Sequence, residues 1–121
     1  MGRVRPDAMA YVAAAARAAL GTRYCWFGVA RDPTQLPHVV YYGIGEETVA
    51  TLDRGSRPVA TRIRIDMRAA TPAETISLDR ALVAELRAGG RLKSLQGLQD
   101  DYEVVGEAGG VHRRIRSVAV R

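Results

Sequence analysis

Residues 62–68 read RIRIDMR, and the strict alternation of apolar and charged side chains limits what this chain can fold into. A period of two is the pattern of a β-strand with one face against a hydrophobic core. The apolar face, extended backwards along the chain, comprises Val59, Ile63, Ile65 and Met67. The charged face comprises Arg62, Arg64, Asp66 and Arg68. Three roles are open for this charged face: plain contact with solvent, a platform for nucleic acid, or a contact with another subunit.

Length and charge restrict these roles only in part. The 121 residues suit a single domain, which can bury enough surface to fold without disulfides, and Cys25 is the single cysteine. The formal net charge of +5 is compatible with a nucleic-acid or other anionic partner. However, the charges are scattered along the chain. Lys93 is the single lysine, and a G+C-rich genome would also produce such a preference for arginine over lysine.

We expect neither a signal peptide nor a membrane span. The alanine-rich stretch at 12–21, VAAAARAALG, is interrupted by Arg17 and is shorter than the roughly 20 residues that cross a bilayer. The expected place of synthesis and use is therefore a cytoplasm.

Two helices are indicated. Pro6 and Gly21 suit the first turn and the end of a helix whose apolar stripe is made of small residues. Residues 71–74, TPAE, form a capping box with proline at the first helical position, and Gly89-Gly90 closes the helix that follows. The apolar side chains on one half of this second helix are Ile76, Leu78, Leu82, Val83 and Leu86.

The strands have sequence signals of differing clarity. Residues 22–30, TRYCWFGVA, are apolar on both alternations, so we expect a strand covered on both faces. Residues 38–45, HVVYYGIG, give a second strand. Residues 46–57 then form a long polar connection that turns at Asp53-Arg54-Gly55, which makes a hairpin with an extended arm.

The last part of the chain is expected to form another hairpin. Residues 101–120 turn around Glu107–Gly110, and this loop places Glu103 opposite Arg114 and Asp101 opposite Arg116. The preceding residues 91–99 are a short strand or irregular. The expected fold is α+β over residues 1–121, in the order α-β-β-β-α-β-β, with one sheet and two helices on one face.

We expect no catalytic, cofactor-binding or metal-binding residues. His38 and His112 are isolated from other ligands along the sequence, and Gly43-Ile44-Gly45 lacks the third glycine of a dinucleotide fingerprint. An enzyme is therefore disfavoured. A single-strand nucleic-acid platform needs aromatic side chains among its basic residues, and RIRIDMR has none.

From Arg23 onward, several motifs resemble those of a known family. LPHVVYY at 36–42 follows a short loop, RIRIDMRA at 62–69 leads into the capped helix, and the final strand RIRSVAV is basic at its start. Over residues 8–121 this pattern resembles the tail-terminator or tail-completion proteins of long-tailed phages and gene transfer agents.

The resemblance implies a structural virion protein of the tail, assembled in the host cytoplasm. Such subunits are α+β domains that form a hexameric ring on the head-proximal end of the tail tube. The ring stops tube polymerisation and joins the capsid connector, and DNA passes through its lumen without specific binding. The implied partners are therefore further copies of the chain, the tail tube protein and the head–tail connector protein, with no membrane and no cofactor.

Within this interpretation, Arg62, Arg64, Asp66 and Arg68 would face a neighbouring subunit or the lumen. The residues of the arm that would contact the tail tube or a neighbour are Glu46, Glu47, Thr48, Val49, Leu52, Asp53 and Arg54. The alternatives are another neck protein, such as a head-closure or adaptor protein, and a small basic nucleic-acid-binding module.

Overall fold

The computed structural model describes residues 6–21, 24–32, 34–51, 55–104 and 110–121. Two helices and five strands follow one another in the expected order α-β-β-β-α-β-β. They are α1 (Pro6–Leu20), β1 (Cys25–Phe27), β2 (His38–Thr51), β3 (Gly55–Ala69), α2 (Pro72–Ala88), β4 (Leu92–Val104) and β5 (Gly110–Val120).

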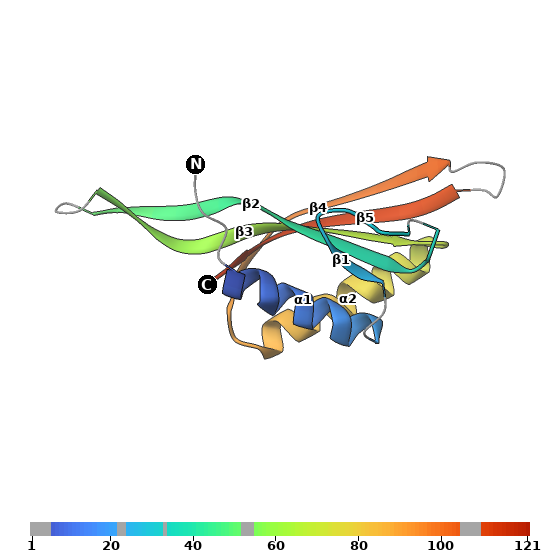
Figure 1. Ribbon diagram of the computed structural model, residues 1–121, viewed down its shortest axis with the longest axis horizontal. Helices are drawn as coiled ribbons and strands as arrows, with labels where there is room; N and C mark the ends of the chain where they lie inside the picture. Colours follow the sequence, from blue (N-terminus) through green and yellow to red (C-terminus); the bar gives the residue numbers. More distant parts are fainter. Residues whose placement is uncertain (1–5, 22–23, 33, 52–54, 105–109) are drawn as a thin grey trace.

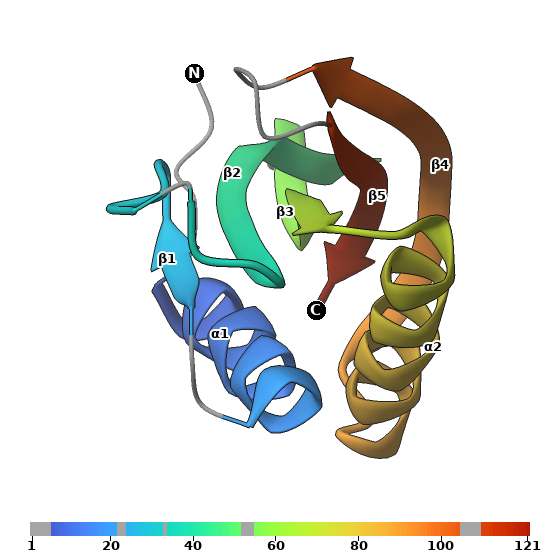
Figure 2. The same ribbon diagram turned by 90° about the vertical axis from the view of Figure 1, so that its right-hand side faces the viewer.

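The five strands form one sheet in the spatial order β1-β2-β3-β5-β4. β1 runs parallel to β2, and the other neighbouring strands are antiparallel. Both helices lie on the same side of this sheet, with α1 beneath β1 and β2 and α2 beneath β4 and β5 (Figures 1 and 2). The expected α+β class, with two helices on one face of a single sheet, is confirmed.

The alternation in RIRIDMR has the expected consequence for β3. The side chains of Ile63, Ile65 and Met67 are fully buried in the core between the sheet and the helices. α1 contributes mostly alanines to this core, which allow the helix to lie close to the sheet, and α2 contributes Leu78, Leu82 and Leu86. The period-two pattern therefore identified the central strand of the sheet correctly.

The ends of α2 follow the sequence signals. The Thr71 hydroxyl accepts a hydrogen bond from the N–H of Glu74 at 3.2 Å, as a capping box requires. At the other end, the hydroxyl of Tyr11 on α1 donates to the carbonyl of Leu86. A Cβ added at Gly89 would overlap the Tyr11 ring, so glycine is needed there for the close approach of the two helices.

The hairpin of β2 and β3 is more regular than the sequence indicated. The expected polar connection at 46–57 is largely strand, because pairing continues from Glu46 opposite Thr61 to Thr51 opposite Gly55. Two register shifts lie within this ladder, between Gly43 and Gly45 and between Glu47 and Thr48. The paired arm extends beyond both helices (Figure 1), and residues 52–54 at its turn lie outside the described residues.

The expected register of the C-terminal hairpin is wrong. Arg114 pairs with Asp100 and Arg113 pairs with Asp101, so Arg114 is not opposite Glu103, nor Arg116 opposite Asp101. The strands are paired up to Val104 and Gly110, which removes the four-residue loop on which the expectation rested. Residues 91–99 are also not irregular, because they belong to the continuous strand β4.

The expectation that residues 22–30 form a strand covered on both faces is also wrong. β1 has three residues and forms one edge of the sheet. Phe27 is 64% exposed, and Val29, just beyond the strand, is 74% exposed. As an edge strand, β1 has a neighbouring strand on one side alone, and the apolar residues at its end and just beyond it remain exposed.

Candidate functional site

The charged half of RIRIDMR lies on the side of the sheet opposite the helices, which we call the helix-free face. Since Ile63 and Ile65 face the core, the alternation along β3 turns the residues between them to this face. Strand pairing places the residues of β2 and β5 beside them. The members from the three strands are His38, Val40, Tyr42, Arg62, Arg64, Asp66, Arg68, Arg113, Ile115, Ser117 and Ala119.

One end of the helix-free face carries a cluster of two arginines and two carboxylates. Asp66 is 6% exposed and lies 2.9 Å from a guanidinium nitrogen of Arg113 and 3.5 Å from Nε of Arg68. Arg68 in turn contacts Glu103 on β4 at 3.1 Å. Because opposite charges alternate through this cluster, it joins three neighbouring strands with little net charge.

The other two arginines of the stretch are exposed. Arg62 donates a hydrogen bond to the side-chain oxygen of Gln96 at 3.3 Å. Arg64 forms no ion pair with any described residue and lies opposite Tyr42. The stretch therefore divides into a neutralised half, Asp66 and Arg68, and a positive half, Arg62 and Arg64.

A depression of about 410 Å³ adjoins the neutralised half. Its wall combines the cluster with apolar groups from β2 and from the segment after β1. The residues that line it are Gly28, Val29, Ala30, His38, Val40, Tyr42, Asp66, Arg68 and Arg113. Oδ1 of Asp66 is buried there without a hydrogen-bond donor among the described residues.

His38 is the buried titratable ring of this depression, with 1% of its surface exposed. Its Nδ1 lies 2.8 Å from the carbonyl oxygen of Gln35, the geometry of a ring N–H that donates to a carbonyl. Trp26 meets the ring edge-on, with the ring centroids 5.5 Å apart. Burial lowers the pKa of His38, although the hydrogen bond to Gln35 acts in the opposite direction.

We expect this histidine to make folding stability fall in mild acid. Its pKa is lower in the folded chain than in the unfolded chain, where it is about 6.5, so the unfolded chain takes up the proton first. Stability is therefore full above pH 6.5 and falls below it, by at most about 1.4 kcal/mol per pH unit. Urea unfolding of the wild type and His38→Gln between pH 7.5 and 5.5 checks this. Equal slopes for the two proteins would contradict it.

The arm residues suggested as contacts have different surroundings. Glu47 is already paired within the chain, since Lys93 and Gln96 on β4 both donate to its carboxylate, and the bond from Lys93 lowers its pKa. Thr48 and Val49 are exposed, Val49 by 46%, and Glu46 is half-buried. Leu52, Asp53 and Arg54 lie outside the described residues.

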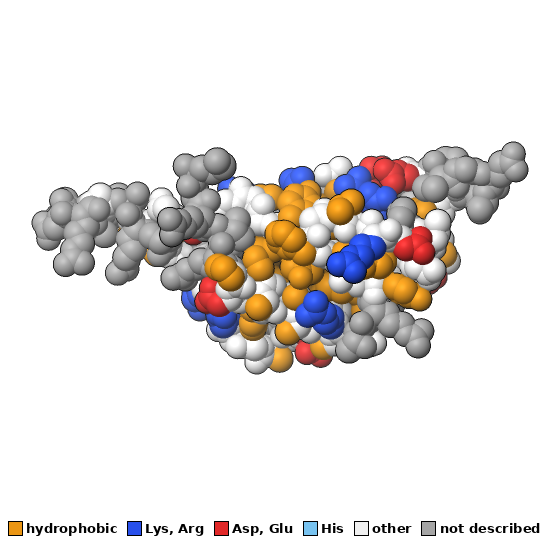
Figure 3. Space-filling view, in the orientation of Figure 1, with side chains coloured by type: hydrophobic (Ala, Val, Ile, Leu, Met, Phe, Trp, Pro, Cys, Tyr) orange, Lys and Arg blue, Asp and Glu red, His pale blue; other side chains and the backbone are white. Residues whose placement is uncertain are grey.

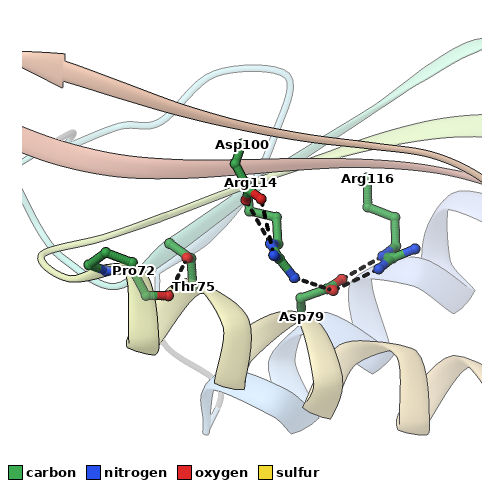
Figure 4. A network of polar contacts seen from close by, with 6 residues as sticks. All are labelled: Pro72, Thr75, Asp79, Asp100, Arg114 and Arg116. Carbon is green, nitrogen blue, oxygen red and sulfur yellow. Dashed lines mark hydrogen bonds and ion pairs between the residues drawn. The ribbon is translucent and has the colours of Figure 1, made fainter.

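A second ionic cluster lies on the opposite side of the sheet, between α2 and β5. Asp79 is 3% exposed and accepts hydrogen bonds from Arg116 at 2.7 Å and from Arg114 at 3.1 Å. Arg114 also binds the exposed carboxylate of Asp100 with two hydrogen bonds, of 2.8 and 3.1 Å (Figure 4). These bonds lower the pKa of Asp100. This cluster joins the helix to the sheet, and within it Asp100 remains exposed.

Sequence reasoning missed several members of the helix-free face. Arg113, Glu103 and Tyr42 join the charged stretch because β2 and β5 pair with β3, and β4 pairs with β5, in registers that the sequence did not reveal. The available signal was the alternation in β5, where Arg113 and Ile115 share a face. Tyr42 also brings an aromatic ring beside Arg64, which RIRIDMR alone lacks.

The described residues contain no group of three or more His, Cys, Asp or Glu placed to hold a metal ion. Among the helices described, neither has the length and hydropathy needed to cross a bilayer.

Comparison with known proteins adds a similarity of fold. No protein-family model matches the sequence, and no curated protein matches it. A solved structure titled "Virion of native gene transfer agent (GTA) particle" contains a chain that is similar at 16% identity and a TM-score of 0.46. The alignment covers 85% of this chain and 81% of that chain.

Proposed function

We propose that this chain is a structural virion protein, a tail-terminator subunit of a phage-like or gene-transfer-agent particle. In this role residues 1–121 act as one domain, and six copies form a ring on the head-proximal end of the tail tube. The ring ends tube polymerisation and joins the tail to the capsid connector. DNA passes through its lumen without specific binding, and the chemistry of a cofactor is not needed.

The observation that carries the proposal is the sequence resemblance at LPHVVYY, RIRIDMRA and the final strand. The helix-free face supports an assembly role, because it combines a neutralised ionic cluster with two exposed arginines, Arg62 and Arg64. Charges of mixed sign on a subunit surface set the register and the specificity of contacts more than their affinity.

The arm is the second surface in this proposal. It extends past both helices and exposes Thr48 and Val49, which are available to the tail tube or to a neighbouring subunit (Figure 1). Leu52, Asp53 and Arg54 complete this proposed contact. Glu47 has a structural role instead, because its carboxylate accepts hydrogen bonds from Lys93 and Gln96 of β4 and so fixes the base of the arm.

Replacing Arg62 and Arg64 together by glutamate tests the role of the helix-free face. We expect a folded protein, because exposed charges contribute about 0–1 kcal/mol each to folding. The six-membered ring should be weakened, since like charges across a seam cost several kcal/mol. Circular dichroism with thermal melting reports the fold, and negative-stain electron microscopy with purified tail tubes reports the ring.

Arg80→Glu with Arg87→Glu is a matched control, because both arginines are exposed on α2, away from the helix-free face. The control should assemble like the wild type. Normal rings from the Arg62 and Arg64 variant would mean that this face is exposed to solvent in the particle. A wild type that forms no ring, even when concentrated with tail tubes, would refute the tail-terminator proposal. If that wild-type protein instead bound DNA in a salt-dependent way, the nucleic-acid-binding alternative would be favoured.

A further inference from the structure

The sheet ends in two open edges of different character. β1 is the last strand on one side and β4 is the last strand on the other (Figure 2). An open edge presents unpaired N–H and C=O groups, to which another chain can bind. Both edges of this sheet also carry large exposed apolar side chains, so each has the features of a contact surface.

The β1 edge is apolar and basic. Phe27 and Val29 are the two most exposed large apolar residues described, at 64% and 74%. They border a hollow of about 580 Å³ that Arg17 and Arg31 also line. Neither arginine forms an ion pair with a described residue. Figure 3 views the molecule from this side and shows hydrophobic side chains at the surface with Lys and Arg side chains among them.

The β4 edge is apolar and acidic. Leu98 is 50% exposed and Tyr102 is 52% exposed, and Asp100 lies between them on the same side of the strand, whereas Asp101 is turned to the helix-free side. Asp100 is bound to Arg114 but its side chain remains 61% exposed. Asp101 forms no ion pair with a described residue, and its carboxylate accepts a hydrogen bond from the N–H of Tyr102 at 2.8 Å.

The apolar groups of the two edges lie on the same side of the sheet. Phe27 packs edge-on against Tyr41, which belongs to the core on the helix side. Leu98 and Tyr102 share the orientation of Asp100, whose partner Arg114 contacts Asp79 of α2. If the β4 edge of one copy lay beside the β1 edge of another, these apolar side chains would be neighbours in a continued sheet.

We propose that the β1 edge of one copy binds the β4 edge of the next, so that the subunit seam is a junction of two sheet edges. Opposite charge favours this pairing, because Arg17 and Arg31 would meet an edge that carries Asp100 and Asp101. Pairing of like edges is disfavoured, since it would place arginine against arginine or aspartate against aspartate. The contact is therefore head-to-tail, the kind that closes into rings. This inference rests on the proposed ring and adds the two sheet edges to the helix-free face among the surfaces that form it.

Charge introduced at each edge tests the seam. Phe27→Glu adds an acidic group that would face the acidic β4 edge, and Leu98→Lys adds a basic group that would face the basic β1 edge. Each single variant should assemble only at a protein concentration about tenfold or more above that of the wild type. Analytical ultracentrifugation and electron microscopy measure this. Both positions are exposed, so thermal melting should show intact folding. Ile44→Glu, an exposed apolar position on the interior strand β2, is the matched control and should assemble normally.

Two combinations then distinguish a head-to-tail seam from a general effect of charge. The double variant Phe27→Glu/Leu98→Lys should recover assembly, because the introduced groups have opposite signs across the same seam. An equimolar mixture of the two single variants should also assemble at concentrations where each alone is monomeric. One seam then joins the two unaltered edges, and the next joins the two introduced groups, which have opposite signs.

The possible results separate this inference from the proposed function. Rings of normal stability from both single variants would overturn the edge-to-edge seam and leave the ring itself standing. Loss of assembly in both, with no recovery in the double variant or the mixture, would also overturn it, because the edges would then not bind one another. Absence of wild-type rings on tail tubes would refute the ring and the seam together.

Discussion

Asp79→Ala is expected to lower the free energy of unfolding by about 3–5 kcal/mol, because it removes the buried carboxylate that two partly buried arginines share. The side chains of Arg114 and Arg116 are 14% and 12% exposed, and that of Asp79 is 4% exposed. Arg116 has no other carboxylate partner among the described residues. Without Asp79, its charge would remain desolvated between α2 and β5 with nothing to neutralise it. Chemical denaturation monitored by circular dichroism measures the loss.

Asp100→Ala is the matched control for this prediction. It removes the other carboxylate of Arg114, but Asp100 is 61% exposed and solvent replaces much of its interaction. We expect a loss of about 0–1 kcal/mol, as for exposed ion pairs. Asp79→Asn should lie between the two, since an amide oxygen can still accept one hydrogen bond but carries no charge. Similar losses for Asp79→Ala and Asp100→Ala would contradict the assigned difference in burial.

The sequence was most informative where local chemistry determines structure. The capping box at Thr71 and the glycines after Ala88 identified both ends of α2, and the alternation in RIRIDMR identified the central strand. These signals depend on hydrogen bonds and burial within a few residues, so tertiary contacts do not override them. The class and the element order followed from the sum of such signals.

Strand register could not be read in the same way. The C-terminal hairpin was expected to turn at 107–110, yet the bidentate contact between Asp100 and Arg114 belongs to a different alignment. Several alignments bring Asp or Glu of β4 opposite Arg of β5, because carboxylates and arginines recur along both strands. The choice among them depends on β3 and α2, which lie far away in the sequence, and this long-range contribution is absent from any local pattern.

The candidate site shows the same division. The four charged residues of β3 were found from their spacing, but the ionic cluster at Asp66 needs Arg113 and Glu103 from strands that follow much later. The edges of the sheet were not predictable either, because their identity depends on the strand order β1-β2-β3-β5-β4. TRYCWFGVA looked like a buried strand for this reason, since its composition does not reveal that it lacks a neighbour on one side.

Ile65→Ala should lower the free energy of unfolding by about 2–5 kcal/mol, the range for truncating a fully buried aliphatic side chain. Ile65 is 0% exposed and lies on the central strand, between β2 and β5 and above the helices. The surrounding strands are held by pairing on both sides, so the cavity cannot collapse easily and the loss should be large within that range. Thermal and urea unfolding measure it.

Arg64→Ala, at the preceding position of the same strand, is the internal control for this last prediction. Arg64 is exposed and has no ion-pair partner among the described residues, so the expected change is within about 0.5 kcal/mol. The contrast between Arg64 and Ile65 tests the alternation directly. The two residues are neighbours on the same strand, so they differ chiefly in the face of the sheet that they occupy. Equal losses at the two positions would mean that both faces of β3 are buried in the free subunit. The helix-free face would then already be covered, and it could not serve as an assembly surface.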